Sequence, residues 1–235
     1  NHHGGHIAVR NGVNSASAEL FRSLRSNVRF VVPSSVTNPV ILVTSSINSE
    51  GKSYVATNLA ISLSLLNKKV ALVGLDIRKP MLAHYLNLPS KGCVTSYLAD
   101  DTYAVDDLIV SSEFENLDIL PAGAIPPNPS ELLQGKRLDE LFAELRKRYD
   151  YIIIDSAPVA MVSDTFLLNR VADMTVYVSR ANYTTTNLID FIKQIHEQKR
   201  WPNIITVLNG VQANGKGYGY GYGYGYGHDV KSGKR

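Results

Sequence analysis

Apolar residues near the start of the chain recur at helical spacing. Leu20, Phe21, Leu24 and Val28 fall within residues 17–30 and follow one another on one helical face at spacings of three and four positions, which predicts an amphipathic helix in that stretch. Ser17 is its expected N-cap, because a serine hydroxyl can accept a hydrogen bond from a free backbone N–H of the first turn. The pattern therefore places a helix before the first predicted strand.

Short, continuously apolar runs follow this helix and alternate with stretches of helical character. Such runs are typical of parallel strands that are buried on both faces. They occupy residues 39–44, 69–75, 117–120, 151–155, 175–179 and 204–208. The stretches predicted as helices between them are 53–67, 131–147, 164–171 and 186–198. This alternation predicts an α/β fold with a doubly wound, mostly parallel sheet, right-handed crossovers and helices on both faces.

The composition changes at both ends of this pattern. The chain opens with Asn-His-His-Gly-Gly-His, which we interpret as part of a disordered or tag-derived segment at residues 1–14. Beyond Val211 glycine and tyrosine alternate, and this much glycine favours a flexible tail at residues 214–235. We therefore expect one folded domain at residues 15–213.

Length, composition and charge narrow the class of protein. The 235 residues suffice for one α/β domain, and 44% hydrophobic with 19% charged residues exclude a chain dominated by disorder. A net charge of +3, with its only basic cluster at residues 231–235, gives no indication of nucleic-acid binding. The single cysteine, Cys93, cannot form an internal disulfide, and no run approaches the roughly 18 apolar residues that span a membrane. These features predict a cytoplasmic protein.

The strongest chemical signal lies between the first predicted strand and its helix, where residues 46–53 read SINSEGKS. Phosphate oxygens need several backbone N–H donors that converge at a helix N-terminus. Gly51 permits close approach, Lys52 supplies positive charge, and the Ser53 hydroxyl can reach Mg²⁺. This P-loop predicts binding of nucleotide by Ser49, Glu50, Gly51, Lys52, Ser53 and Tyr54.

Two further strands end in a carboxylate. Asp155 follows the apolar run 151–154, and Asp76 follows the run 69–75. Because the carboxyl ends of parallel strands meet at one edge of a sheet, both carboxylates are expected beside the P-loop. Mg²⁺ prefers hard oxygen ligands and keeps several waters, so Ser53, Asp76 and Asp155 together form a candidate magnesium site. An alternative is that Asp155 only caps a helix.

With these motifs the chain resembles the bacterial tyrosine kinases of capsule and exopolysaccharide systems, relatives of the deviant-Walker ATPases that partition chromosomes and place septa. The resemblance implies ATP and Mg²⁺ as cofactors, and catalysis by Lys52, Asp76 and Asp155. It also implies autophosphorylation, between subunits, of the tail tyrosines, which are Tyr218, Tyr220, Tyr222, Tyr224 and Tyr226. The expected outcome is regulation of polysaccharide polymerisation and export.

The same resemblance assigns further residues and partners. Glu19, Arg22 and Arg25 match a pattern that contacts the neighbouring subunit of a ring, and Asn209 matches an asparagine near the adenine. The segment 123–133 looks like another motif of the family. The implied partners are further copies of the chain, a membrane-spanning polysaccharide co-polymerase region, fused upstream or on a separate subunit, and a tyrosine phosphatase. The chain is then expected at the inner face of the cell membrane.

Each of these assignments has a structural alternative. Glu19 and Arg22 can form a simple pair within one helix, and Asn209 can be a turn residue. Asn128 and Pro129 suit the N-cap and first position of a helix, with Glu131 completing the cap. Arg78 and Lys79 can be surface charges, and the Gly-Tyr tail can be a linker.

The chain also departs from the family pattern. Gly74 stands where the family commonly carries a carboxylate two positions before the residue matching Asp76, so the role of base falls to Asp76, to water or to no group. Within the P-loop, Ser46, Asn48 and Ser49 replace the usual glycine, proline and glycine. Two other functions therefore stay open: an ATPase switch of the partitioning type, and an inactive scaffold that only binds nucleotide.

Overall fold

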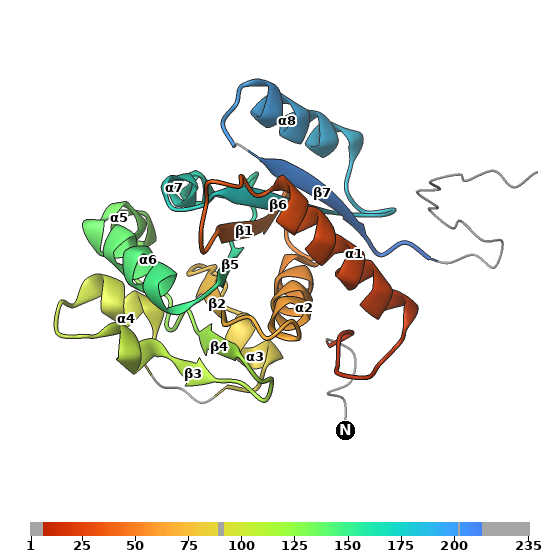
Figure 1. The fold of residues 1–235 in the computed structure, drawn as a ribbon. Coiled ribbons are helices and arrows are strands. Elements are labelled where there is room, and N and C mark those ends of the chain that lie inside the picture. Colours follow the sequence, from red (N-terminus) through yellow and green to blue (C-terminus); the bar gives the residue numbers. More distant parts are fainter. Residues whose placement is uncertain (1–6, 89–91, 202, 213–235) are drawn as a thin grey trace, which may run out of the picture.

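The structure is a computed structural model that describes residues 7–88, 92–201 and 203–212. In these residues one seven-stranded sheet has the order β3-β4-β2-β5-β1-β6-β7 (Figure 1). All neighbouring strands are parallel except β3, which runs antiparallel to β4 at one edge. The strands are β1 (Val40–Ser45), β2 (Val70–Leu75), β3 (Val110–Ser111), β4 (Leu117–Leu120), β5 (Tyr151–Ser156), β6 (Met174–Arg180) and β7 (Ile204–Asn209). The predicted α/β class and the mostly parallel sheet are confirmed.

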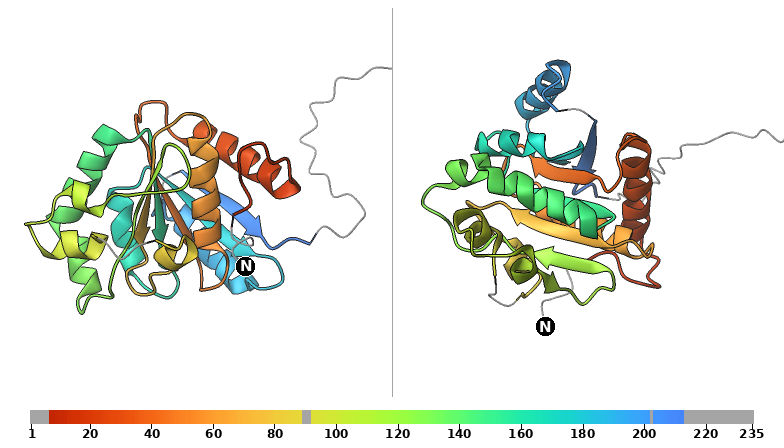
Figure 2. Two further views of the ribbon diagram at one scale, coloured as in Figure 1. Left: turned by 90° about the horizontal axis from the view of Figure 1, so that it is seen from below. Right: turned by 60° about the vertical axis from the view of Figure 1, so that its left-hand side comes forward.

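Helices cover both faces of the sheet (Figure 2). One face carries α1 (Ala16–Val31), α2 (Lys52–Ser64) and α3 (Leu82–Tyr85). The opposite face carries α4 (Val94–Ala99), α5 (Pro129–Gln134), α6 (Lys136–Arg148), α7 (Asp164–Leu167) and α8 (Thr186–Glu197), together with the short 3₁₀ helices η1 (Val105–Leu108) and η2 (Leu168–Arg170). This is the doubly wound arrangement expected from the alternation of strands and helices.

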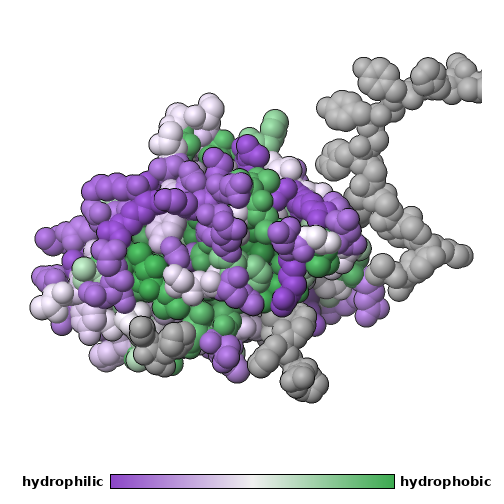
Figure 3. All heavy atoms as spheres, turned by 60° about the horizontal axis from the view of Figure 1, so that its bottom comes forward, coloured by the Kyte–Doolittle hydropathy of each residue, from purple (hydrophilic) through white to green (hydrophobic). Residues whose placement is uncertain are grey.

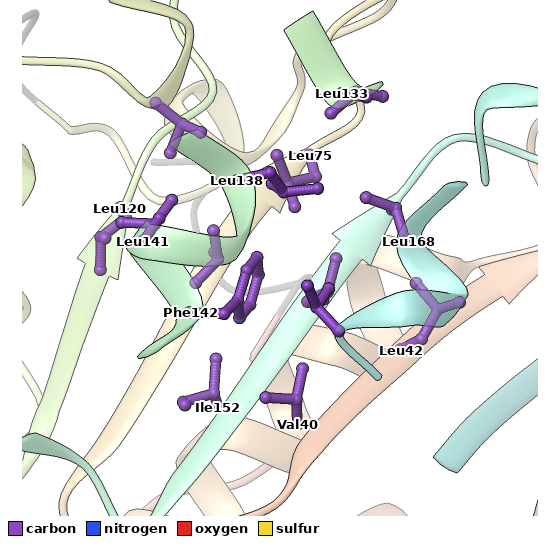
Figure 4. Close-up of a cluster of buried hydrophobic side chains, with 14 of the residues drawn as sticks. Val40, Leu42, Leu75, Leu120, Leu133, Leu138, Leu141, Phe142, Ile152 and Leu168 are labelled. Carbon is purple, nitrogen blue, oxygen red and sulfur yellow. The ribbon is translucent and has the colours of Figure 1, made fainter. Parts of the chain in front are cut away.

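The strands contribute side chains to a separate core on each face. In β1, Val40 and Leu42 belong to one cluster, whereas the alternate residue Ile41 belongs to the other. Figure 4 shows Leu141 and Phe142 of α6 directed at the strands of the first cluster. Successive side chains of a strand point to opposite faces, so a run with no polar interruption is what two-sided burial requires.

Helix α1 begins earlier than predicted. Its N-cap is Ser15, whose backbone is extended and whose hydroxyl accepts a hydrogen bond of 3.1 Å from the N–H of Ala18. Ser17, the expected N-cap, already lies inside the helix. Both serines suit the role chemically, and the hydrophobic spacing did not separate them because Ala18 also faces the core.

A second correction concerns residues 131–147, which were predicted as one helix. Gly135 has extended backbone angles (φ −63°, ψ 152°) and separates α5 from α6. The N-terminus of α5 agrees with its predicted capping residues in position: Asn128 is the N-cap and Pro129 is the first helical residue. The Asn128 amide donates a hydrogen bond to the carboxylate of Glu131 at 3.0 Å, so this part of the 123–133 segment has a structural role.

The predictions for the two ends of the chain fall largely on residues that the structure does not describe. The tail tyrosines lie outside the described residues, as do residues 1–6, and the predicted domain boundaries at residues 15 and 213 stay predictions. Among the described residues no helix is both long enough and apolar enough to cross a membrane. On the face shown in Figure 3, hydrophobic side chains form a central patch bordered by hydrophilic ones.

Candidate functional site

The predicted P-loop joins β1 to α2 in a tightly curved backbone. Ser49 has φ +67° and Gly51 has φ +100°, and both values lie in the left-handed region that favours glycine. A Cβ on Gly51 would lie 2.1 Å from the amide nitrogen of Asn209, so only glycine fits there. Helix α2 begins directly afterwards at Lys52, and its free N–H groups therefore face the loop. The geometry suits a phosphate group.

Glu50 supports the loop from within. Its side chain is fully buried, one carboxylate oxygen accepts a hydrogen bond of 2.8 Å from the N–H of Ile47, and the other contacts the hydroxyl of Thr184. A buried carboxylate held in this way stabilises the curve of the loop. The side chain of Glu50 is held by the protein itself, and the predicted contact of Glu50 with nucleotide stays a prediction.

The ends of β6 and β7 fix the outer side of the P-loop. Arg180 donates a hydrogen bond of 2.9 Å to the carbonyl of Ser49, and Asn209 donates one of 3.0 Å to the carbonyl of Glu50. Asn209 was predicted from the sequence as a site residue, whereas Arg180 and Thr184 were not. Their position in the sequence could have indicated them. Both residues follow the strand predicted at 175–179, and the carboxyl ends of parallel strands lie at one edge of the sheet.

The backbone still forms a P-loop although Ser46 and Ser49 stand where the family pattern has glycine. The hydroxyl of Ser46 contacts that of Tyr177, which is fully buried in β6. Burial raises the pKa of Tyr177 to about 12, so this phenol stays protonated and can donate. Ser49 adopts the positive φ that a glycine would take at no steric cost.

Lys52 lies between the two predicted carboxylates. Its Nζ is 2.8 Å from Asp76 Oδ2 and 3.9 Å from Asp155 Oδ1. The strand register explains the meeting, because Gly74 pairs with Asp155 and the N–H of Asp76 donates to the Asp155 carbonyl at 3.0 Å. Burial alone would lower the pKa of Lys52, but Asp155 and Asp76 together outweigh it and the pKa is raised. Lys52 is therefore held as a cation.

Asp155 is the most deeply buried acid of the site. It is 2% exposed and lies within β5, which excludes the alternative that it merely caps a helix. Burial raises the pKa of its carboxyl group, and Lys52 and a hydrogen bond from Ser53 oppose the shift. Its Oδ1 is buried and has no hydrogen-bond partner among the described residues. A buried carboxylate oxygen of this kind, next to a serine hydroxyl, fits Mg²⁺.

A second polar cluster holds the loop that follows Asp76. Asp76 Oδ1 accepts a hydrogen bond of 3.0 Å from the N–H of Lys79. Arg78 binds Asp164 Oδ2 through Nε at 2.7 Å and Nη2 at 2.6 Å, and the Ser130 hydroxyl donates to Asp164 Oδ1 at 2.7 Å. Arg78 is exposed, as expected of a surface charge, and it also anchors this loop to α5 and α7. Nothing in the sequence indicated its partner Asp164.

Gly74 lies in β2 directly opposite Asp155, where the family pattern expects a carboxylate. A Cβ here would lie 3.0 Å from the backbone nitrogen of Ala122. A larger residue therefore requires the segment after β4 to move slightly. Asp76 and Asp155 remain the carboxylates that the described chain brings to Lys52.

The ring of Tyr54 points away from the phosphate-binding loop. It packs edge-on against Phe21 of α1, with ring centroids 5.6 Å apart. Tyr54 was predicted to bind nucleotide, and its backbone N–H lies in the first turn of α2, so binding through this group stays a prediction.

The three α1 residues predicted at a subunit interface all have partners within the chain. Glu19 contacts Arg22, which also donates hydrogen bonds to Val13 O at 3.1 Å and Asn14 Oδ1 at 3.0 Å. Arg25 donates a hydrogen bond of 2.6 Å to the carbonyl of Ser62 at the end of α2. Burial and the neighbouring Arg22 lower the pKa of Arg25. An interface role for these residues stays a prediction.

The fold and the site are those of the P-loop class of α/β domains. The family model described as "AAA domain" matches residues 40–205, and the chain belongs to that family. Within it, the chain is 36% identical over 172 residues to the tyrosine-protein kinase YwqD of Bacillus subtilis, covering 72% of this chain and 71% of the relative. It is 32% identical over 209 residues to the tyrosine-protein kinase wzc of Salmonella typhimurium, covering 89% of this chain and 27% of that longer relative.

A solved structure agrees with these sequence relatives. The kinase domain of the Escherichia coli tyrosine kinase ETK superposes with a TM-score of 0.80 at 28% identity, covering 92% of this chain and 84% of that one. The chain belongs to the bacterial tyrosine-protein kinases, and the resemblance seen in its motifs is confirmed.

Proposed function

We propose that this chain transfers the γ-phosphoryl group of ATP to tyrosine hydroxyls in the Gly-Tyr tail of a second copy. The observation that carries the proposal is the placement of Lys52, at the end of the P-loop, between Asp76 and Asp155. We further propose that the reaction regulates polysaccharide polymerisation and export through a membrane-spanning partner, with a tyrosine phosphatase as its opponent. The match to only 27% of the longer kinase wzc supports a partner region of that kind.

Each residue of the site has a distinct role in this proposal. The backbone N–H groups that follow Gly51 bind phosphate oxygens, and Lys52 moves its charge from the carboxylates toward them. Ser53, Asp76 and Asp155 are the groups that would hold Mg²⁺, which when bound neutralises charge on the phosphates. Phosphoryl transfer depends on positioning and charge neutralisation, so no protein nucleophile is needed.

Asp76 is the proposed group for orienting the tyrosine hydroxyl. It is buried at the carboxyl end of β2 beside Lys52, and its loop is fixed by Arg78 and Lys79. A tyrosine has a pKa near 10 in solution, so a base helps to remove its proton. The loose transition state of phosphoryl transfer makes early proton removal less necessary, which makes the reaction compatible with Gly74.

A mixture of two variants tests transfer between copies. One chain carries Lys52→Met and an intact tail, and the other is active but has its five tail tyrosines replaced by phenylalanine. After incubation with Mg-ATP, phosphate is mapped by mass spectrometry. We expect label on the tail of the Lys52→Met chain, because only the other chain can transfer phosphate and only this tail can accept it.

The controls separate the possible failures. The Lys52→Met chain alone should remain unlabelled, and the parent protein should label strongly. An unlabelled tail in the mixture, with strong labelling of the parent, contradicts transfer between copies and leaves transfer within one chain. Phosphate release from the parent without any phosphotyrosine contradicts the kinase and indicates an ATPase switch. If neither phosphotyrosine nor free phosphate forms, the chain is an inactive scaffold that only binds nucleotide, the alternative that Gly74 favours.

The α1 residues give a separate prediction about self-association. Replacing Glu19, Arg22 and Arg25 together with alanine is expected to shift the protein toward monomer, measured by light scattering at a concentration where the parent is oligomeric. Arg29→Ala is the matched control, because Arg29 is an exposed cation on the same helix. An unchanged mass for the triple variant, with circular dichroism equal to the parent, contradicts an interface role.

A further inference from the structure

A hydrophobic hollow of about 440 Å³ lies beside the P-loop, on the face of the sheet that carries α7 and α8. We call it the apolar groove. Its walls come from the loop after β5, from α7 and from α8. Apart from Ser163 and the small Ala160, its lining residues have larger apolar side chains. These are Val159, Met161, Val162, Phe166, Leu188 and Phe191. Its volume falls in the range of roughly 300–1,000 Å³ typical of ligand pockets.

Backbone hydrogen bonds join the groove to the P-loop. The N–H of Val159 donates to the Ser45 carbonyl at 2.8 Å, and that of Ala160 donates to the Ser46 carbonyl at 3.1 Å. On the rim, the Asn48 amide lies 3.2 Å from the sulfur of Met161. A side chain that occupies the groove is therefore held directly next to the loop that binds the phosphates.

The groove presents apolar surface to solvent at this position. Met161 is 54% exposed, and Phe166 and Phe191 are only partly buried. A flexible methionine beside aromatic rings is typical of surfaces that bind other apolar or aromatic groups. Val159, in contrast, is buried and belongs to the core on this face of the sheet.

We propose that the apolar groove binds a tyrosine ring of the Gly-Tyr segment, residues 217–227, from a second copy of the chain. This inference rests on the proposed function and names the acceptor site for it. The segment follows the last described residue by only a few positions, and its tyrosines are separated by glycine alone, so one ring can enter an apolar hollow without a neighbouring side chain in the way. β7 ends at Asn209, which donates a hydrogen bond to the carbonyl of Glu50, so the segment starts from the same edge of the sheet as the P-loop. The choice of a second copy follows from the transfer between copies that is proposed above.

The same groove disfavours the product. A phosphotyrosine carries about −1.5 to −2 charges, and none of the groove's lining residues is a cation that would pair with them. Burial of an unpaired charge in apolar surroundings is costly. The phosphorylated ring therefore leaves the groove, and the next unmodified tyrosine of the repeat replaces it.

Trp201 offers a direct measurement of occupancy. It is the single tryptophan of the chain and stacks on Phe166, a wall of the groove, with ring centroids 5.2 Å apart. In a protein whose own tail tyrosines are changed to alanine, added GYGYGYGYG peptide should change the Trp201 fluorescence saturably without nucleotide. A GAGAGAGAG peptide should cause no change, and the peptide with phosphotyrosine should bind at least tenfold more weakly.

Two groove variants test the location. Met161→Glu, at an exposed position, and Phe191→Ser should each weaken binding of the tyrosine peptide at least tenfold. Ile189→Ser is the matched control, because Ile189 is an exposed apolar residue of α8 that does not line the groove. Equal binding by Met161→Glu and the parent, or equal binding of both the phosphorylated and the plain peptide, overturns the proposal.

The same variants keep this inference separate from the proposed function. Peptide binding is measured without ATP, so a protein that binds the peptide yet never transfers phosphate refutes only the kinase proposal. A protein that transfers phosphate to the peptide with the same KM in Met161→Glu as in the parent refutes only the groove.

Discussion

Replacing Lys52 with methionine is expected to abolish phosphoryl transfer, with a loss of roughly 10³-fold or more in rate. Lys52 is the buried cation that the described residues place at the N-terminus of α2, within reach of the phosphate-binding loop. Its charge stabilises the negative charge that spreads over the transferred group. The measurement is phosphotyrosine formation with Mg-ATP under single-turnover conditions.

The structure adds a second effect to this variant. Methionine leaves Asp76 and Asp155 side by side without their cation, and removing one partner of a buried ion pair costs about 3–5 kcal/mol. Lys52→Arg is the matched control, since it keeps a positive charge between the carboxylates but changes the geometry toward the phosphates. We expect both variants to lose transfer and only Lys52→Met to lose stability in urea unfolding. Full activity in either folded variant would remove Lys52 from the mechanism.

Replacing Asp155 with asparagine is expected to raise the Mg²⁺ concentration needed for half-maximal transfer by about 10–100-fold. Asparagine keeps the size of the side chain and removes the charge of the buried oxygen that lacks a hydrogen-bond partner. Lys52 retains its closer ion pair with Asp76, so the fold should survive. Calorimetric titration of ADP with and without Mg²⁺ gives a readout that does not depend on catalysis.

Asp190→Asn is the control for this variant, because Asp190 is an exposed acid on α8 and its replacement leaves the site untouched. If Mg²⁺ gives Asp155→Asn the same gain in ADP affinity as it gives the parent, Asp155 is no part of the magnesium site. A gain that disappears in Asp155→Asn and persists in Asp190→Asn supports the assignment.

Much of the site follows from local sequence. The positions of Gly51 and Lys52, and of the strand-end residues Asp76 and Asp155, are given by apolar runs that end where polar residues begin. Parallel strands bring their carboxyl ends to one edge, so three places far apart in the chain, the P-loop and the two carboxylates, meet without any further information. The strand and helix alternation alone was sufficient for this part of the prediction.

The contacts that hold the site residues in place depend on the tertiary structure. Arg180 reaches Ser49, and Arg78 reaches Asp164, only because the strand order sets β6 beside β1 and sets β2 beside β5, the strand that α7 follows in the chain. Such partners lie far apart in the sequence, and the local hydrophobic period carries no information about them. The apolar groove has the same origin, since α7 and α8 are separate amphipathic segments that form a hollow only after packing on one sheet.

What the sequence alone determined is therefore the class of fold, the phosphate-binding loop and the two carboxylates, because each depends on a short pattern and on the direction of parallel strands. Only the folded chain decided the cap of α1, the break at Gly135 and the partner of Glu50. The physical reason is competition. Several residues suit each of these roles locally, and long-range packing selects one of them.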